Sequence, residues 1–144
     1  MKVLIDTNIV SELRKGARCD RNVAAWFAAL PADGVYLSAL VIGEIRQGIE
    51  RIRRRDAKAA RSLDAWLRKL VATHDERILP VDRRVAEEWG RMNVPNPVPV
   101  VDGLMAATAK VHDLILATRN VKDISGTGAR VVNPFEVFPS ASST

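Results

Sequence analysis

Four carboxylates stand at positions where this sequence could hold a metal ion. Each follows a strand-like segment or lies near the start of a helix-like one: Asp6, Glu44, Asp102 and Asp123. A cluster of carboxylates repels itself unless a cation lies between its members, and hard divalent ions such as Mg²⁺ or Mn²⁺ prefer oxygen ligands. Such ions can lower the pKa of a bound water and offset the charge on a phosphate. If the four side chains meet, they predict phosphoryl chemistry that needs no histidine, cysteine or nucleophilic serine.

Each carboxylate also has a purely structural interpretation that the residues alone leave open. Asp6 could cap the helix that follows it, and Glu44 could be a solvated helix residue. Asp102 could be a first-turn carboxylate favoured by the helix dipole, and Asp123 could be a turn residue. Their joint position in the fold favours the metal site over four separate explanations.

The elements that would position these side chains alternate along the chain. Strand-like segments cover residues 2–5, 35–37, 78–81, 114–117 and 130–132, and helix-like patterns cover 38–52, 56–72, 82–92 and 101–112. This alternation predicts a three-layer α/β/α domain with a central, mainly parallel sheet of about five strands. In such folds the ligand site lies beyond the carboxyl ends of the strands. The four carboxylates are therefore expected near one edge of the sheet.

The length and composition indicate one basic domain. The chain has 144 residues and a net charge of +5, which favours anionic partners such as nucleic acid. Residues 1–139 are expected to form a single domain, and 140–144 a polar tail. The one cysteine, Cys19, allows no intrachain disulfide. No segment approaches the roughly 20 apolar residues of a membrane span, and no signal-peptide pattern opens the chain. A cytoplasmic protein without membrane contact is expected.

Basic residues gather in two stretches. A run of arginines in "RIRRRDAKAAR" and a smaller group near the first helix could contact RNA phosphates beside the acidic site. The alternative is a solvated corner between two helices. The candidate RNA-binding residues are Arg14, Arg51, Arg53, Arg54 and Arg55.

Four segments, in this order, resemble the PIN-domain ribonucleases and specifically the VapC-type toxins of bacterial toxin–antitoxin pairs. The segments are "LIDTNIVSEL", "LSALVIGEIRQGI", "DGLMAATAKVHDLILATRNVKDI" and "VVNPFE", and they cover almost the whole chain. The resemblance implies a PIN-like fold and an acidic site that binds Mg²⁺ or Mn²⁺. Asp6 and Asp102 would be metal ligands, and Glu44 would complete the ligand set or position the water.

The fourth position of the site stays open between two residues. In many relatives the last acid lies two residues after the threonine, where this chain has Asn120, so that either Asp123 or Asn120 could fill the role. The resemblance further implies that neighbouring polar groups hold the carboxylates in place. These are Thr7, Asn8, Thr118 and Asn120.

The function implied is that of a metal-dependent RNA endonuclease, a hydrolase in which a metal-activated water cleaves phosphodiester bonds. Its partners would be RNA, a cognate antitoxin and a second copy of the chain, in a heterotetramer or larger complex. One alternative is an aspartate-nucleophile phosphatase, but such enzymes usually carry a second aspartate where this chain has Asn8. Another is a PIN-like module that binds RNA without cleaving it.

Overall fold

A five-stranded, entirely parallel sheet forms the centre of the molecule. The computed structural model describes residues 1–136, so that the predicted tail at 140–144 lies outside the described residues. The sheet order is β3-β2-β1-β4-β5, and all four pairings are parallel. All five predicted strands are confirmed, each with slightly shorter bounds or bounds moved by a residue. They are β1 (Val3–Ile5), β2 (Val35–Ser38), β3 (Ile78–Leu79), β4 (Ile115–Ala117) and β5 (Val131–Val132).

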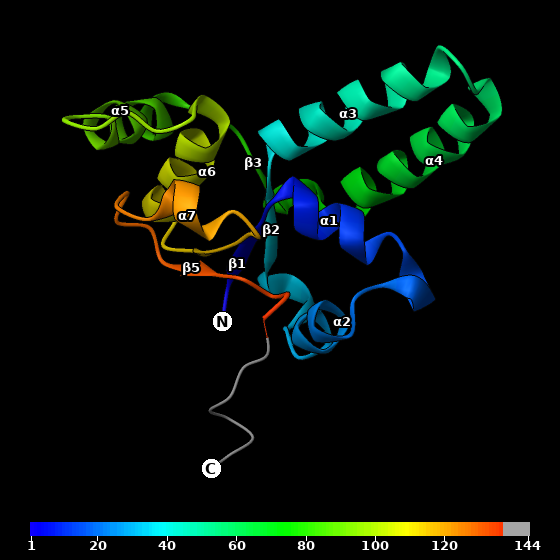
Figure 1. Cartoon of the computed structure of the whole chain (residues 1–144), viewed down its shortest axis with the longest axis horizontal. Coiled ribbons are helices and arrows are strands. Elements are labelled where there is room, and N and C mark those ends of the chain that lie inside the picture. The colour runs from blue at the N-terminus through cyan, green and yellow to red at the C-terminus, as the bar shows by residue number, and fades with distance from the viewer. Residues whose placement is uncertain (137–144) are drawn as a thin grey trace.

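Helices connect the strands and cover the sheet, which confirms the predicted α/β architecture (Figure 1). The four predicted helices are present within two residues of their predicted bounds. Periodicity does not predict α2 or α7, because eight and four residues are too few for a clear apolar stripe. The helices are α1 (Thr7–Leu13), α2 (Arg21–Ala28), α3 (Ala39–Arg53), α4 (Ala57–His74), α5 (Arg83–Met92), α6 (Val100–Val111) and α7 (Val121–Ile124).

Side-chain caps define where three of the predicted helices begin. Ser38 accepts a hydrogen bond from the backbone N–H of Leu40 at the start of α3 (3.0 Å). Asp56 and Asp82 do the same for the third residue of α4 and of α5, each at 3.0 Å. A cap of this kind stabilises a helix by about 1 kcal/mol, because it satisfies a backbone donor that has no partner inside the helix.

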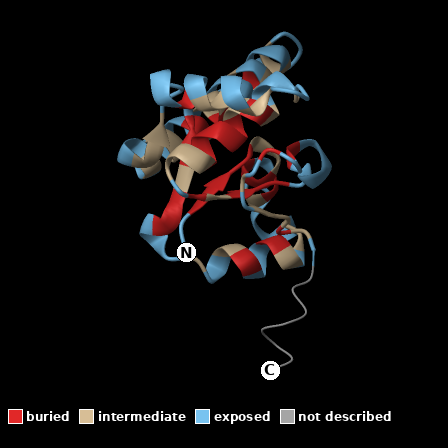
Figure 2. Cartoon of the chain, turned by 90° about the vertical axis from the view of Figure 1, so that its left-hand side faces the viewer, coloured by how far each residue is buried: buried red, intermediate tan, exposed pale blue. Residues whose placement is uncertain are grey.

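The core lies where the sequence has continuous apolar runs. Val3, Leu4 and Ile5 of β1 are at most 2% exposed, and Leu37 and Leu116 on the neighbouring strands are fully buried. A central strand covered on both faces buries side chains of both parities, so its sequence shows no alternation. Figure 2 shows the buried residues gathered at the centre, with exposed residues on the outer helices. No helix within residues 1–136 is long and apolar enough to cross a membrane.

The strand order reverses direction at β1. The chain adds β2 and β3 on one side of β1 and then crosses over to add β4 and β5 on the other side. The loops that leave the carboxyl ends of β1 and β4 therefore diverge, and a crevice opens between them. Figure 1 shows the two helical pairs that flank this edge, with α3 and α4 on the right and α5 and α6 on the left.

Candidate functional site

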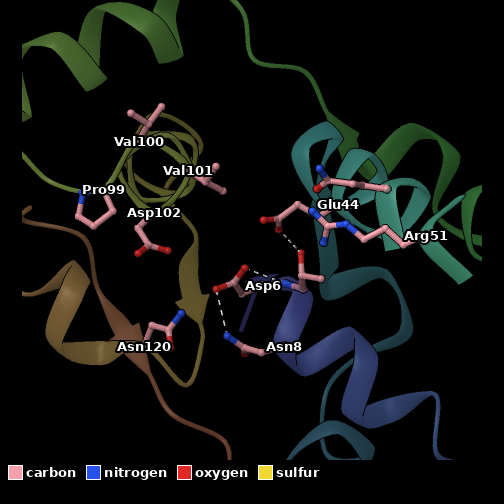
Figure 3. Close-up of a pocket in the computed structure, with 11 residues that line it drawn as sticks. Asp6, Asn8, Glu44, Arg51, Pro99, Val100, Val101, Asp102 and Asn120 are labelled. Carbon is pink, nitrogen blue, oxygen red and sulfur yellow. Dashed lines mark hydrogen bonds between the residues drawn. The ribbon is translucent and has the colours of Figure 1, made fainter. Parts of the chain in front are cut away.

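A cavity of about 610 Å³ lies at this edge of the sheet and brings three of the predicted carboxylates together (Figure 3). Asp6 comes from the end of β1, Glu44 from α3 and Asp102 from α6. Three separate elements thus supply one carboxylate each. The lining residues are Asp6, Thr7, Asn8, Glu44, Gln47, Arg51, Pro99, Val100, Val101, Asp102 and Asn120.

Hydrogen-bond donors from three other residues hold the Asp6 carboxylate at the end of β1. The Asp6 backbone N–H continues the sheet by donating to the carbonyl oxygen of Ala117 (2.9 Å). Its Oδ1 accepts from the N–H of Thr7 (2.7 Å), which caps α1. Its Oδ2 accepts from Thr118 Oγ1 (2.7 Å) and from Asn8 Nδ2 (3.3 Å). Asp6 is therefore a helix cap, as one interpretation predicts, and its 6% exposed side chain also lines the cavity.

Thr118 and Asn8 join the ends of β1 and β4 behind the cavity. The fully buried Thr118 donates to Asp6 and accepts from the N–H of Asn120 (3.1 Å). Asn8 Nδ2 also lies 3.3 Å from Thr118 Oγ1, and Asn8 Oδ1 accepts from the N–H of Arg119 (3.2 Å). These bonds limit the movement of the Asp6 carboxylate.

Glu44 is oriented across the cavity by one short hydrogen bond. Thr7 Oγ1 donates to Glu44 Oε1 at 2.5 Å, so the residue after Asp6 connects the first carboxylate to the second (Figure 3). Glu44 lies in the second turn of α3, which begins directly after β2. The contact therefore joins α1 to α3 at the mouth of the cavity.

The negative charges of the other carboxylates act on Asp102 and affect its pKa. Its pKa is raised above the usual value, first by burial and then by the negative charges of Asp6, Asp123 and Glu44. Asp102 lies in the first turn of α6, where the helix dipole favours a negative charge. Burial and repulsion outweigh the dipole here. A cation in the cavity would relieve the repulsion.

Close packing between α5 and α6 positions Asp102. The next residue is Gly103, where an added Cβ would lie 2.7 Å from Val98 Cγ2 and 3.0 Å from Trp89 Cδ1. No side chain fits there without displacing one of these neighbours. The glycine therefore lets the first turn of α6 approach α5 and sets where the Asp102 carboxylate enters the cavity.

The two candidates for the fourth position occupy different places. Asn120 lines the cavity, whereas Asp123 is an exposed residue of α7 and is absent from the lining. Asp123 is still near enough for its charge to raise the pKa of Asp102. Asn120 thus offers a neutral amide inside the cavity, and Asp123 offers a negative charge at its rim.

The donor set fits a hydrated divalent ion. Within residues 1–136, no three carboxylate, histidine or cysteine side chains are arranged as a ready set of ligands for one ion. Mg²⁺ does not need such a set, because it keeps several waters and commonly binds through one or two carboxylates. A cavity that holds three carboxylates at three different walls can supply one or two direct oxygens and hydrogen-bond the waters with the rest.

Four lining residues have no place in the predicted site. Gln47 lies three residues after Glu44 and shares its helical face, so a helical wheel of α3 could have identified it. Pro99, Val100 and Val101 form an apolar wall at the start of α6. Val101 has the hydrophobicity of a core residue, yet it is 37% exposed and lines the cavity.

The five predicted RNA-binding arginines lie in different surroundings. Arg51 lines the cavity, whereas Arg53 forms ion pairs with Glu50 and Asp64. The guanidinium of Arg14 lies 5.7 Å from the ring centre of Trp66. The other two, Arg54 and Arg55, are exposed where α3 ends and the chain turns toward α4.

Comparison with known proteins defines the class. The family model of the PIN domain matches residues 3–125, and the chain belongs to the PIN-domain family. It is 31% identical over 142 residues to the VapC ribonuclease Y4jK of Sinorhizobium fredii, covering 93% of this chain and 98% of that protein. It is 32% identical over 139 residues to the toxin FitB of Neisseria gonorrhoeae, covering 92% and 98%.

Solved structures agree with these sequence relatives. The crystal structure of FitAcB from Neisseria gonorrhoeae superposes with a TM-score of 0.86 at 30% identity, covering 94% of this chain and 99% of that chain. A toxin–antitoxin complex from Klebsiella pneumoniae gives a TM-score of 0.72 at 26% identity, covering 94% of this chain and 100% of that chain. The fold of this chain is thus the fold of these solved relatives over nearly their whole length.

Proposed function

We propose that this chain is a metal-dependent RNA endonuclease and the toxin of a toxin–antitoxin pair. The observation that carries the proposal is the cavity at the sheet edge, where Asp6, Glu44 and Asp102 converge. Burial, and then the charges of the neighbouring carboxylates, raise the pKa of Asp102 there. Carboxylates left without a cation partner in one cavity are expected of a metal site rather than of a structural one. The relatives named as a ribonuclease and a toxin support the same assignment.

Each residue of the site has a task in this proposal. Asp6 and Asp102 would hold Mg²⁺ or Mn²⁺, which when bound lowers the pKa of a water and offsets charge on the phosphate. Glu44, oriented by Thr7, would accept hydrogen bonds from the attacking water and align it. Thr118 and Asn8 would keep the Asp6 carboxylate in one rotamer. Asn120 would supply a neutral polar contact at the fourth position.

Cleavage should depend on a divalent ion. Purified protein is expected to cut RNA with Mg²⁺ or Mn²⁺ and to stop when EDTA is added, because no histidine or cysteine lines the cavity in the described residues. Sequencing of the cleaved ends would define the substrate. Undiminished cleavage in EDTA, with bound metal excluded by elemental analysis, would contradict the mechanism.

Two alternative functions, a phosphatase and an RNA-binding module without catalysis, predict different results in activity assays. An aspartate-nucleophile phosphatase needs a proton donor two residues after the nucleophile, and Asn8 at that position is already bonded to Asp6 and Thr118. Release of inorganic phosphate from a small phosphomonoester, without RNA cleavage, would favour that enzyme. RNA binding without cleavage at any divalent ion would favour the non-catalytic module.

A protein partner is proposed from the neighbours in the same way. One solved neighbour, at 26% identity, is a toxin–antitoxin complex from Klebsiella pneumoniae. We therefore expect this chain to bind an antitoxin, and to do so as a homodimer within a heterotetramer or larger complex. Co-expression with the product of the adjacent reading frame should give a stable complex and restore growth. If expression of this chain alone does not slow growth, and the product of the adjacent reading frame does not bind it, the chain is not a toxin of such a pair.

A further inference from the structure

One face of α3 carries polar residues into the cavity in a row. Glu44, Gln47 and Arg51 are spaced three and seven residues apart, which places them on the same face of a helix. Arg51 lies nearly two turns beyond Glu44, about 10 Å along the axis. Long side chains on a helix lean toward its N-terminus, so Arg51 reaches back over Gln47 toward the carboxylates. Figure 3 shows its guanidinium group directed into the cavity beside Glu44.

Arg51 differs from Arg46 and Arg53 of the same helix in having no carboxylate partner among the described residues. Arg46 binds Asp64 at 2.8 Å and Glu50 at 3.2 Å, and Arg53 binds the same two carboxylates at 3.4 and 3.0 Å. Those two guanidinium groups are committed to holding α3 against α4. Arg51 is free to meet an anion that enters the cavity.

The charges in the cavity indicate what that anion is. Of the lining side chains in the described part of the chain, only Arg51 is positive, against three carboxylates. One divalent ion and Arg51 together would balance the three carboxylates. Without Arg51 the loaded cavity would stay negative and repel a second phosphate of the substrate. By cancelling this negative charge, Arg51 allows a second backbone phosphate to bind next to the one being cleaved.

The opposite wall determines which side of the substrate faces α3. Pro99, Val100 and Val101 line that side, and Val100 is 59% exposed. An apolar wall can pack against a base or sugar but offers no partner to a phosphate. The charged backbone of a single strand is thus directed toward α3.

We propose that Arg51, assisted by Gln47, binds the RNA phosphate adjacent to the scissile one and guides the strand along α3. The inference rests on the proposed nuclease function. A guanidinium group can bind two phosphate oxygens through parallel N–H donors, and the Gln47 amide can donate a third bond. Arg51 is then a substrate-binding residue that acts beside the metal site and is not needed to hold the metal.

The test measures binding of RNA as a function of salt, separately from cleavage. The probe is the shortest single-stranded RNA fragment that the wild-type protein cleaves, labelled and titrated with Asp102→Asn protein so that it survives. One lost phosphate contact lowers the slope of log affinity against log salt by about 0.7 for single strands. Arg51→Gln should show that loss, together with a roughly tenfold to hundredfold lower affinity at low salt.

Arg68→Gln is the matched control, because it removes the same charge from α4. The Arg68 side chain is 79% exposed, and its contact with Asp64 is 3.8 Å long. This variant should keep the wild-type slope, whereas Arg51→Lys should restore the slope but only part of the affinity. An unchanged slope in Arg51→Gln, or the same loss in both glutamine variants, would overturn the inference.

The outcomes also separate this inference from the function on which it rests. If the wild-type protein cleaves no RNA, the proposed function fails and the inference fails with it. If the wild-type protein cleaves RNA and Arg51→Gln matches it in rate and salt slope, only the role of Arg51 is wrong. If Arg51 merely offsets carboxylate repulsion, Arg51→Gln should melt lower without metal and leave the salt slope unchanged, which also contradicts the proposal.

Discussion

Two partly buried aspartates in this molecule have opposite surroundings. Asp64 on α4 is bound by Arg46 at 2.8 Å, and Arg53 and Arg68 lie within 3.8 Å. The hydrogen bond from Arg46 is the largest cause of a lowered pKa at Asp64. Asp102 has burial and three negative neighbours in place of cations, and its pKa is raised. The difference distinguishes a carboxylate that holds two helices together from one that is left to bind something else.

The largest expected effect is on RNA cleavage, and it follows from changing a carboxylate of the cavity. Asp6→Asn should lower RNA cleavage by at least about a hundredfold, because losing a direct ligand should cost more than losing a group that only supports one. Asparagine is nearly the same size and also caps helices, so α1 should form as before. Initial cleavage rates with saturating Mg²⁺ measure the effect.

Asp64→Asn is the control for that experiment. It should leave cleavage within about threefold of wild type while lowering the melting temperature, because Arg46 and Arg53 lose their shared partner. If a folded Asp6→Asn protein cleaves RNA at the wild-type rate, Asp6 acts only as a helix cap. Strong loss of cleavage in Asp64→Asn would mean that the two aspartates do not differ in the way proposed.

The next effect concerns a residue that touches a carboxylate from behind the cavity. Thr118→Val keeps the shape of the buried side chain but removes the donor to Asp6 Oδ2. Cleavage should fall by about tenfold to a hundredfold, as for other groups that orient a metal ligand. Thr118→Ser retains the hydroxyl and should stay close to wild type. Equal rates in the valine and serine variants would show that the hydrogen bond does not matter for catalysis.

Much of this comparison is visible in the sequence. The apolar runs of β1 and β4 predict buried parallel strands, and the carboxyl ends of parallel strands share one edge. That rule places Asp6, which follows β1, and Glu44, in the helix after β2, at one edge. Asp102 follows no strand and joins them because α6 begins beside the same cavity. The rule works because it depends on chain order and strand direction, and not on the details of side-chain packing.

Other parts depend on tertiary contacts that no local pattern encodes. The sequence of α3 does not reveal that Asp64, on the following helix, pairs with Arg46 and Arg53. Nor does it reveal that Arg51 has no carboxylate partner within residues 1–136. The choice between Asn120 and Asp123 depends on the four-residue helix α7, which is too short to show a period. Val101 has the hydrophobicity of a core residue, and only the position of α6 beside the cavity explains its exposure.

The smallest expected effects are on stability, and they test the comparison of the two aspartates most directly. The contributions of Asp102 and Asp64 to the free energy of unfolding should change with pH in opposite directions. The raised pKa of Asp102 gives stability below the unfolded value of about 3.9, which is lost as pH rises through the folded pKa. The lowered pKa of Asp64 gives stability above about 3.9, which is lost as pH falls through its folded pKa. At neutral pH the first carboxylate destabilises the metal-free protein and the second stabilises it.

Thermal melting of Asp102→Asn and Asp64→Asn in EDTA, from neutral to acidic pH, tests these signs. At pH 7 the Asp102→Asn protein should melt above wild type and the Asp64→Asn protein below it. Both differences should shrink as the pH approaches the unfolded value, because protonated aspartate then carries no charge to relieve or to pair. Adding Mg²⁺ at pH 7 should raise the melting temperature of wild type more than that of Asp102→Asn, since an ion that binds the folded state stabilises it by mass action. If Asp102→Asn melts below wild type in EDTA at pH 7, the repulsion inferred among the cavity carboxylates is absent.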